Sequence, residues 1–325
     1  MNEIIVQDGD SDYSNHSLYK NDIPFKERGV NEWWELKHSE IFFDNNNLIG
    51  YGSNGYVYKT YWRGLNCVVK LINIKTKNYD NNYNDLVNEI SIISRLRHPN
   101  LVLFLGACTI KEPLLLLYEY LPKGNLEEYY NSRKSYFVKV WKPSKEIIDK
   151  WLLQLTQAIY FLHNCYYPII HRDIKPTNIL LDNSLNIKLT DFGLSKLVKT
   201  KNDCYNMSGV TGTIRYMAPE VILSDTTYHL KVDIYSLSLN FWFICTGLIP
   251  YKGYNLENKY IIEFIIKENI RPDINKLKWL KSDNFIDLIK KMWSSSPFIR
   301  PEINEVLEFL ENNKFYKNNK YIKLF

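Results

Sequence analysis

The stretch LIGYGSNGYVYK, residues 48–59, places Gly50, Gly52 and Gly55 in a G-x-G-x-x-G pattern, with Val57 two residues later. Glycine permits positive φ angles and a close approach of the backbone to a ligand, so this stretch could hold phosphate groups. The phosphates could belong to a dinucleotide or to ATP. An ordinary loop has the same composition, so residues elsewhere in the chain must decide between these three interpretations.

Four further motifs follow the glycines. Lys70 ends the stretch CVVK, HRDIKPTN occupies 171–178, DFG occupies 191–193, and APE occupies 218–220. With the glycines they resemble the eukaryotic protein kinases, from the glycine stretch to Arg300. A glycine pattern alone is weak evidence for a family. The probability that all of these motifs occur in this order by chance is well below about 1%.

The resemblance implies ATP as the cofactor, with the glycine stretch over its phosphates. Lys70 would hold the α- and β-phosphates, and a buried lysine needs a carboxylate partner, which we expect to be Glu89. Asp191 and Asn178 would hold Mg²⁺, or Mn²⁺ in its place, because such cations prefer oxygen ligands.

Two residues of HRDIKPTN would act on the transferred group. In the family pattern Asp173 accepts the proton of the attacking hydroxyl, and Lys175 stabilises the charge in transfer. We therefore predict Asp173, Lys175, Lys70 and Asn178 as the catalytic residues.

The resemblance also outlines a nucleotide pocket. The stretch LLLLYEYL, residues 114–121, would supply the hinge, where Glu119 to Leu121 would offer backbone groups to adenine, and Leu180 would form the floor. Tyr118 is bulky and should narrow the space behind the adenine. The predicted nucleotide-binding residues are Ile49, Gly50, Gly52, Gly55, Val57, Val68, Lys70, Glu89, Tyr118, Glu119, Leu121 and Leu180.

Some motif residues are expected to have structural roles. Asp233 resembles a buried anchor that hydrogen-bonds the backbone of the HRDIKPTN loop. Glu220 and Arg300 resemble a structural ion pair. Thr213 is expected to bond Asp173 and Lys175 within the site.

The residues at particular positions of these motifs favour Ser/Thr specificity. Lys175 follows the predicted base, and GTIRYMAPE carries Thr213, both of which resemble Ser/Thr kinases. HPNLVLFLGAC, DFGLSK and the leader WWELKHSEI resemble the tyrosine-kinase-like group, which includes Raf. The resemblance also implies that Arg172 pairs with a phosphate on the loop before APE, and we predict autophosphorylation at Ser208 or Thr211.

The elements that position these residues change in type along the chain. Around the glycines we expect two paired strands, NLIGYGSNG and YVYKTYW, followed by a third, LNCVVKLINI. One helix, NYNDLVNEISIISRL, and two apolar strands come next, and after residue 121 long apolar-faced helices dominate. We therefore predict an α+β, bilobal kinase fold, with a small antiparallel sheet lobe carrying one main helix and a larger helical lobe.

The domain bounds follow from these changes. We expect a disordered polar tail at 1–32 and a kinase domain at 33–318, with lobes at about 40–121 and 122–318. The remaining residues, 319–325, form a basic tail.

Composition limits the partners. The net charge is +5 from 41 basic and 36 acidic residues, and a nucleic-acid site would need a more concentrated basic patch. Five cysteines without a C-x-x-C pair favour neither disulfides nor a zinc site, so a reducing compartment is expected. The first residues lack the features of a signal peptide, and the apolar run 234–250 is short for a bilayer span. We predict a soluble cytoplasmic protein that acts on protein substrates, without nucleic-acid or membrane partners.

Two alternatives belong to other classes. A pseudokinase, which would be a binding module on the same fold, predicts loss of Lys70, Asp173, Asn178 or Asp191, and all four are present. A nucleotide-dependent oxidoreductase needs its glycines between a strand and a helix, with an acidic residue about 20 positions further on. Here the glycines lie between two expected strands, so we reject that class.

Overall fold

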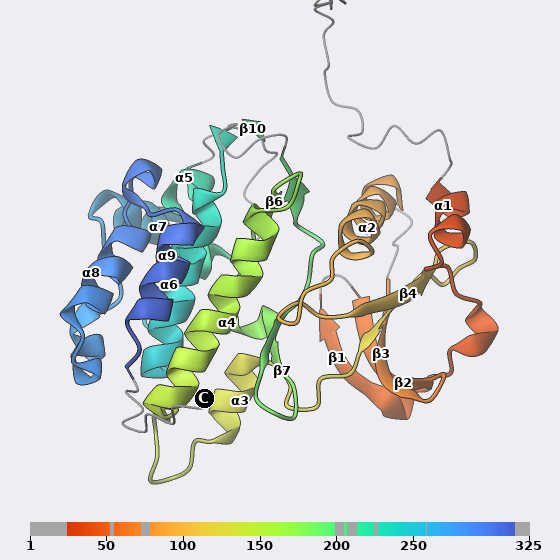
Figure 1. Cartoon of the computed structure of the whole chain (residues 1–325), viewed down its shortest axis with the longest axis horizontal. Helices are drawn as coiled ribbons and strands as arrows, with labels where there is room; N and C mark the ends of the chain where they lie inside the picture. Colours follow the sequence, from red (N-terminus) through yellow and green to blue (C-terminus); the bar gives the residue numbers. More distant parts are fainter. Residues whose placement is uncertain are drawn as a thin grey trace, which may run out of the picture.

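The structure is a computed structural model that describes residues 25–52, 55–72, 79–198, 205–206, 213–223, 227–257 and 259–315. A small lobe built on a sheet stands beside a larger helical lobe (Figure 1). This arrangement confirms the predicted α+β bilobal fold.

The small lobe is a five-stranded antiparallel sheet with the strand order β1-β2-β3-β5-β4. Side chains alternate between its faces: Cys67 and Val69 of β3 are fully buried, whereas Val68 and Lys70 are half-buried on the other face. The helix α2 (Tyr79–Ile93) belongs to this lobe. The strands are β1 (Leu48–Gly52), β2 (Gly55–Trp62), β3 (Leu65–Leu71), β4 (Phe104–Cys108) and β5 (Leu115–Glu119).

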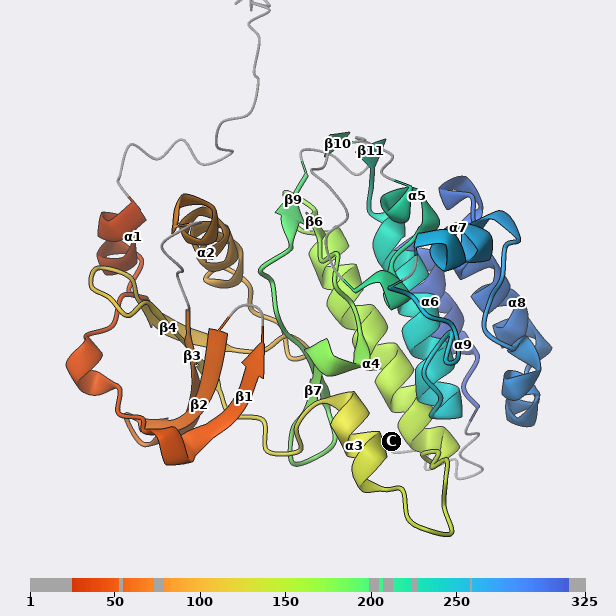
Figure 2. The same cartoon turned by 180° about the vertical axis from the view of Figure 1, so that it is seen from behind.

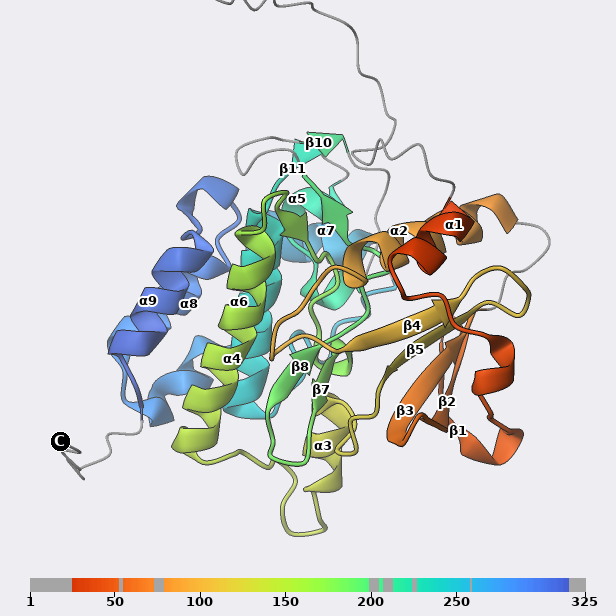
Figure 3. The same cartoon turned by 45° about the vertical axis from the view of Figure 1, so that its right-hand side comes forward.

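The large lobe is organised around one helix. Every residue of α6 (Lys231–Thr246) after its first is buried, because the helix is apolar on all sides. This confirms that the apolar run at 234–250 forms a core helix. Figure 3 shows α4 (Lys145–His163) beside α6. The other helices are α3 (Leu126–Ser132), α5 (Pro219–Ile222), α7 (Lys259–Lys267), α8 (Asp283–Met292) and α9 (Ile303–Asn312).

Several short strands and 3-10 helices carry or adjoin the motif residues. Three two-stranded sheets pair β6 with β9, β7 with β8, and β10 with β11. Their bounds are β6 (Ile169–Ile170), β7 (Ile179–Leu181), β8 (Ile187–Leu189), β9 (Lys196–Leu197), β10 (Tyr205–Asn206) and β11 (Thr227–Tyr228). Short 3-10 helices are η1 (His38–Glu40), η2 (Asn45–Asn47), η4 (Pro176–Asn178), η5 (Ile214–Tyr216), η6 (Ile274–Leu280) and η7 (Pro297–Ile299).

The segment before the sheet departs from the sequence-based expectation. Disorder was expected through residue 32, but Phe25–Asn31 forms the helix α1, so that expectation is wrong for these residues. The segment is held because Leu36 N donates to Ala107 O (2.7 Å) and Ala107 N donates to Trp34 O (2.8 Å), which adds it to the edge of β4. Trp34 is buried, as expected of a leader that packs on its domain, whereas Trp33 is 91% exposed. Residues 1–24 lie outside the described part of the chain.

Candidate active site

A cleft of about 610 Å³ contains residues from both lobes, a size typical of small-molecule sites. Figure 2 shows the β1–β2 hairpin on the side of the small lobe that faces β7 and α3. The predicted residues that line the cleft are Ile49, Gly50, Gly55, Val57, Val68, Lys70, Glu89, Tyr118, Glu119, Leu121, Lys175, Asn178, Leu180 and Asp191. Among the described residues, predicted Asp173 does not line the cleft itself but contacts Asn178 and Lys175 beside it, and Gly52 ends β1.

Sequence reasoning missed part of this lining. The missed residues are Tyr51, Val102, Pro122, Gly124, Asn125, Glu128, Thr177 and Thr190, whereas Tyr120 lies within the predicted stretch 119–121. Asn125 and Glu128 could have been found, because N-x-x-E before a helix is the signature of a capping box. The structure has that box at the start of α3, with Glu128 N donating to Asn125 Oδ1 at 2.9 Å.

The glycine stretch forms the turn of the β1–β2 hairpin. Gly50 pairs with Val57, and Gly52 pairs with Gly55, so the glycines lie between two antiparallel strands as predicted. Gly55 has a φ of +131°, a conformation that side chains other than glycine rarely adopt. A strand–glycine–strand arrangement also excludes the dinucleotide-binding interpretation, which requires a helix after the glycines.

Lys70 stands between two carboxylates. Its Nζ lies 3.1 Å from Glu89 Oε1 and 3.4 Å from Asp191 Oδ1, which confirms the predicted pairing with Glu89. Burial alone would lower the pKa of Lys70, but the two carboxylates outweigh it and raise that pKa above its ordinary value. Burial raises the pKa of Asp191, but Lys70 outweighs this effect and holds it below the ordinary value. Lys70 therefore stays protonated and Asp191 stays ionised.

Tyr118 contributes a contact that the sequence did not indicate. Its hydroxyl donates to Glu89 Oε1 at 3.0 Å, and the ring packs edge-on against Phe104 with centroids 5.7 Å apart. Burial, followed by the negative charge of Glu89, raises the pKa of Tyr118 well above 10.0, so the phenol stays a hydrogen-bond donor. Tyr118 thus lines the cleft and also fixes the carboxylate that pairs with Lys70.

The HRDIKPTN loop gathers polar groups around Asp173. Asn178 Nδ2 donates to Asp173 Oδ2 at 2.9 Å, and Lys175 Nζ lies 2.6 Å from the same oxygen. Lys175 Nζ also donates to Thr213 Oγ1 at 2.8 Å, and Thr213 N donates to Asp173 Oδ1 at 3.2 Å. The predicted contacts of Thr213 are confirmed, and they connect the loop to the segment before APE.

Asp233, in the first turn of α6, anchors the HRDIKPTN loop. The side chain is fully buried and accepts from the backbone N–H groups of His171 (2.8 Å) and Arg172 (3.0 Å), and it contacts His163 Nε2 at 2.9 Å. These bonds confirm the predicted anchor and hold Arg172 at a φ of +72°. Burial raises the pKa of Asp233, but the His163 hydrogen bond leads the effects that bring it below its ordinary value.

The C-lobe ion pair is also confirmed. Arg300 Nη1 donates to Glu220 Oε1 at 2.6 Å and Nη2 to Oε2 at 2.7 Å, and both side chains are buried. The pair ties APE to the segment before α9.

The residues around Asp191 suit a divalent cation that also binds phosphates. No cluster of three or more His, Cys, Asp or Glu side chains gathers within the described ranges. Asn178 commits its amide nitrogen to Asp173, which leaves the amide oxygen for a cation, and Asp191 supplies a carboxylate in the same cleft. Mg²⁺ is typically bound in this way, by one or two protein oxygens with waters and phosphates completing the shell.

Comparison with known proteins agrees with this geometry. Residues 43–309 match the model of the protein kinase domain family. The chain is 36% identical over 285 residues to serine/threonine-protein kinase VIK of Arabidopsis thaliana, covering 86% of this chain and 62% of that protein. It is 33% identical to the putative serine/threonine-protein kinase/receptor R831 of Acanthamoeba polyphaga mimivirus, covering 87% of this chain and 17% of that protein. It is 29% identical to serine/threonine/tyrosine-protein kinase HT1 of Arabidopsis thaliana, covering 87% of this chain and 69% of that protein.

The two lobes and the motif residues around their cleft agree with a family match that covers most of the sequence. The chain belongs to the protein kinase family. The relatives confirm the predicted resemblance to Ser/Thr kinases of the tyrosine-kinase-like group. Among the helices that the structure describes, none has the length and apolar character needed to cross a bilayer.

Proposed function

We propose that this chain transfers the γ-phosphate of Mg-ATP to Ser or Thr hydroxyls of protein substrates. The observation that carries the proposal is the Asp173 carboxylate, which Asn178, Lys175 and Thr213 hold at the edge of the cleft that contains the Lys70–Glu89–Asp191 group. A family match over residues 43–309 supports a kinase domain at 33–318.

The cleft offers one place for each part of the nucleotide. Adenine would lie between Val68 and Leu180, where residues 119–121 also line the cleft. The Glu119 carboxylate is already paired with Lys188 (2.7 Å), so the backbone of 119–121, and not this side chain, would bond the base. The phosphates would lie under the β1–β2 hairpin and beside Lys70. Asp191 and Asn178 would hold Mg²⁺, which neutralises charge on the phosphates when bound.

Asp173 would accept the proton of the substrate hydroxyl. Its Oδ2 accepts a hydrogen bond from Asn178 Nδ2 and pairs with Lys175 Nζ, and its Oδ1 accepts a hydrogen bond from the Thr213 backbone N–H. The carboxylate is therefore fixed before substrate arrives. Lys175 would move from this contact toward the transferred phosphoryl group and stabilise its charge. Positioning and charge neutralisation of this kind are the main contributions in phosphoryl transfer.

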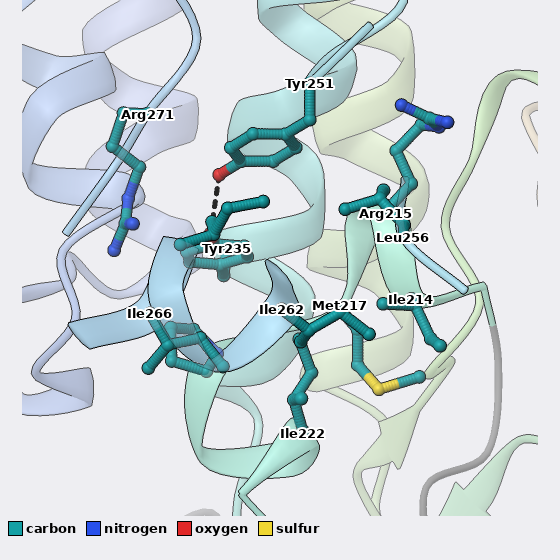
Figure 4. A pocket seen from close by; sticks show the side chains of 12 residues that line it. Ile214, Arg215, Met217, Ile222, Tyr235, Tyr251, Leu256, Ile262, Ile266 and Arg271 are labelled. Atoms are coloured by element: carbon teal, nitrogen blue, oxygen red, sulfur yellow. Dashed lines mark hydrogen bonds between the residues drawn. The ribbon is translucent and has the colours of Figure 1, made fainter. Parts of the chain in front are cut away.

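A second, much smaller pocket of about 20 Å³ lies beside the segment that carries APE. It begins one residue after Thr213 and lies between η5, α6 and α7 (Figure 4). Tyr235 and Tyr251 meet at its base through their hydroxyls, 3.1 Å apart. Its apolar wall consists of Ile214, Met217, Pro219, Ile222, Leu256, Ile262, Ile265 and Ile266. A volume of this size holds about one water molecule, so the pocket would have to widen before it took a substrate side chain.

We also infer that a phosphate on the loop before APE regulates the enzyme. Burial lowers the pKa of Lys196, and the positive charge of Arg172 lowers it further, so two cations lie close together beside this loop. Such a pair favours a bound phosphate. The predicted phosphorylation sites Ser208 and Thr211 lie outside the described residues.

The direct test is phosphate transfer from radiolabelled ATP with Mg²⁺ to a mixed library of Ser, Thr and Tyr peptides. We expect label on Ser and Thr, and a loss of at least about 100-fold in Asp173→Asn, the range of general-base catalysis. Equal signals from the two proteins would contradict the proposal. Mass spectrometry of the active enzyme tests the regulatory part, which fails if the loop at 199–212 is unmodified.

A further inference from the structure

The loop between α3 and α4 carries two adjacent and highly exposed aromatic side chains. Ten consecutive residues, 131–140, are exposed, and Tyr136 and Phe137 are each 90% exposed. Figures 1 and 2 show this loop projecting past the ends of α3 and α4. We call residues 133–142 the aromatic loop. Two adjacent aromatic side chains exposed to this extent form an apolar surface that is available to a partner.

The aromatic loop presents these rings at the tip of a turn. Ser135 N donates to Val138 O at 3.1 Å, and Val138 N donates to Ser135 Oγ at 3.1 Å. Tyr136 and Phe137 are therefore the two central residues of the turn, with ring centroids 5.2 Å apart and planes at 88°. The tip is convex and apolar.

The base of the loop is fixed to the large lobe. Trp141 packs edge-on against Tyr129 and Tyr130, with centroids 5.8 Å and 5.1 Å apart. Gly247 approaches the Trp141 carbonyl so closely that a Cβ at Gly247 would lie 2.4 Å from its oxygen. The tip therefore projects from a rigid support.

The aromatic loop is also strongly cationic. The sequence from 129 to 145 holds no Asp or Glu, and its basic residues are Arg133, Lys134, Lys139, Lys142 and Lys145. None of them forms an ion pair with a carboxylate in the part of the chain that the structure describes. Glu127, Glu128 and Glu146 flank this stretch, so the excess of positive charge is confined to the loop itself, where it is available to an anionic partner.

A second basic segment begins at the same end of α4. Phe315 N donates to Asp149 Oδ1 at 3.0 Å, which places the end of the described chain beside the first turns of α4. The sequence continues with Lys317, Lys320 and Lys323, and 316–325 contain no acidic residue. Like charge argues against this tail as the occupant of the aromatic loop.

We propose that the aromatic loop binds the surface of an anionic phospholipid bilayer, with Tyr136 and Phe137 at the headgroup level. Aromatic side chains favour the membrane interface, and nearby Lys and Arg side chains are attracted to anionic lipids. A small convex tip suits a bilayer, whereas a stable protein interface needs roughly 800 Å² on each partner. The proposal goes beyond phosphate transfer, and it replaces the sequence-based expectation of no membrane partner.

Co-sedimentation of the full chain with vesicles tests the proposal. We expect the chain to sediment with vesicles of phosphatidylcholine mixed with phosphatidylserine and to stay in solution with phosphatidylcholine alone. Lys134→Gln/Lys139→Gln should weaken binding by about thirtyfold, the effect of two cations near an anionic surface. Phe137→Ser should weaken binding by about tenfold, and salt should weaken it for the wild type.

Tyr166→Ser is the matched control. Tyr166 is 91% exposed and stacks edge-on with Tyr167 at 4.8 Å, at the opposite end of α4 and without basic neighbours in the sequence. It should bind vesicles as the wild type does, and all variants should keep the wild-type melting temperature and peptide phosphorylation. Failure of the wild type to bind mixed vesicles, or equal binding by Phe137→Ser, would overturn the proposal while leaving the kinase function intact. Binding to a single-stranded oligonucleotide in place of vesicles would overturn it as well.

Discussion

The Tyr118 hydroxyl donates to Glu89 Oε1 at 3.0 Å, the same oxygen that lies 3.1 Å from Lys70 Nζ. One carboxylate oxygen thus receives a neutral donor from β5 and a cationic donor from β3. Because Tyr118 is buried and its pKa is raised by burial and by Glu89, the contact persists over the pH range in which a kinase works. Tyr118 therefore positions α2 against the sheet through Glu89.

Replacing Tyr118 by Phe removes this hydroxyl and keeps the ring. A hydrogen bond to a charged group contributes about 1.5–3 kcal/mol, so Glu89 should hold Lys70 less firmly and kcat/KM for ATP should fall by about tenfold or more. Steady-state kinetics with varied ATP measures the change.

Tyr130→Phe is the control for a buried tyrosine outside the site. Tyr130 donates to Ile244 O at 2.6 Å in the large lobe, so its loss should lower the free energy of unfolding by about 1 kcal/mol without changing kcat/KM. Unchanged kinetics in Tyr118→Phe would mean that the hydroxyl does not position Glu89.

The sequence predicted those parts of the site whose residues have few alternative roles. Lys70 needed a carboxylate, and the helix with Glu89 followed it, so the pair could be predicted before its geometry was known. Asp233 and the glycine hairpin could be predicted in the same way. The Tyr118 hydroxyl could not, because its direction depends on the β3–β5 register, in which Val68 lies opposite Tyr118.

Longer-range packing also escaped prediction. The helix α1 and Trp34 are held by backbone pairing between residues 34–36 and Ala107, about 70 positions apart. Composition indicated disorder for the residues of α1, because that segment is polar and the strand that holds the neighbouring chain is remote in sequence, whereas Trp34 was expected to pack on the domain. The aromatic loop had no periodicity that distinguished it from an ordinary connection.

Breaking the Glu220–Arg300 pair should destabilise the large lobe. Arg300 is 1% exposed and Glu220 8%, so Arg300→Met leaves a buried carboxylate unpaired, at a cost of about 3–5 kcal/mol. Urea unfolding measures the loss. Lys290→Met, which breaks an exposed pair with Asp287 at 3.1 Å, should cost under about 1 kcal/mol. Similar losses in the two variants would show that the buried pair has no special role.

Stability should fall as the solution becomes mildly acidic. Burial lowers the pKa of His171 from 6.5, and it outweighs Asp233, Asp173 and Asp191, which raise it. A lowered folded pKa means that the unfolded chain takes up the proton first. The stabilisation is therefore complete above about 6.5 and is lost as the pH falls through the folded pKa. Burial lowers the pKa values of His98 and His229 too, with the same sign.

Urea midpoints measured at a series of pH values test this dependence. His171→Gln stays neutral, so its midpoint should fall less steeply than that of the wild type as the pH drops below about 6.5. The slope is the informative quantity, because the substitution also lowers the midpoint at every pH by disturbing the bond to Thr190 O (3.1 Å). Parallel curves would show that His171 is protonated equally in the folded and unfolded chains.

A bulky residue at Gly52 should weaken the use of ATP without unfolding the chain. Gly52 pairs with Gly55 at the tip of the β1–β2 hairpin, where the backbone would approach the phosphates, so Gly52→Val should raise KM for ATP by about tenfold. Leu48→Val, an exposed change at the start of the same strand, should leave KM unchanged. Both variants should melt close to the wild type, because Val is a favourable strand residue and the two changes lie at the two ends of β1. A Gly52→Val chain that unfolds, or that uses ATP normally, would show that the glycines serve only the turn.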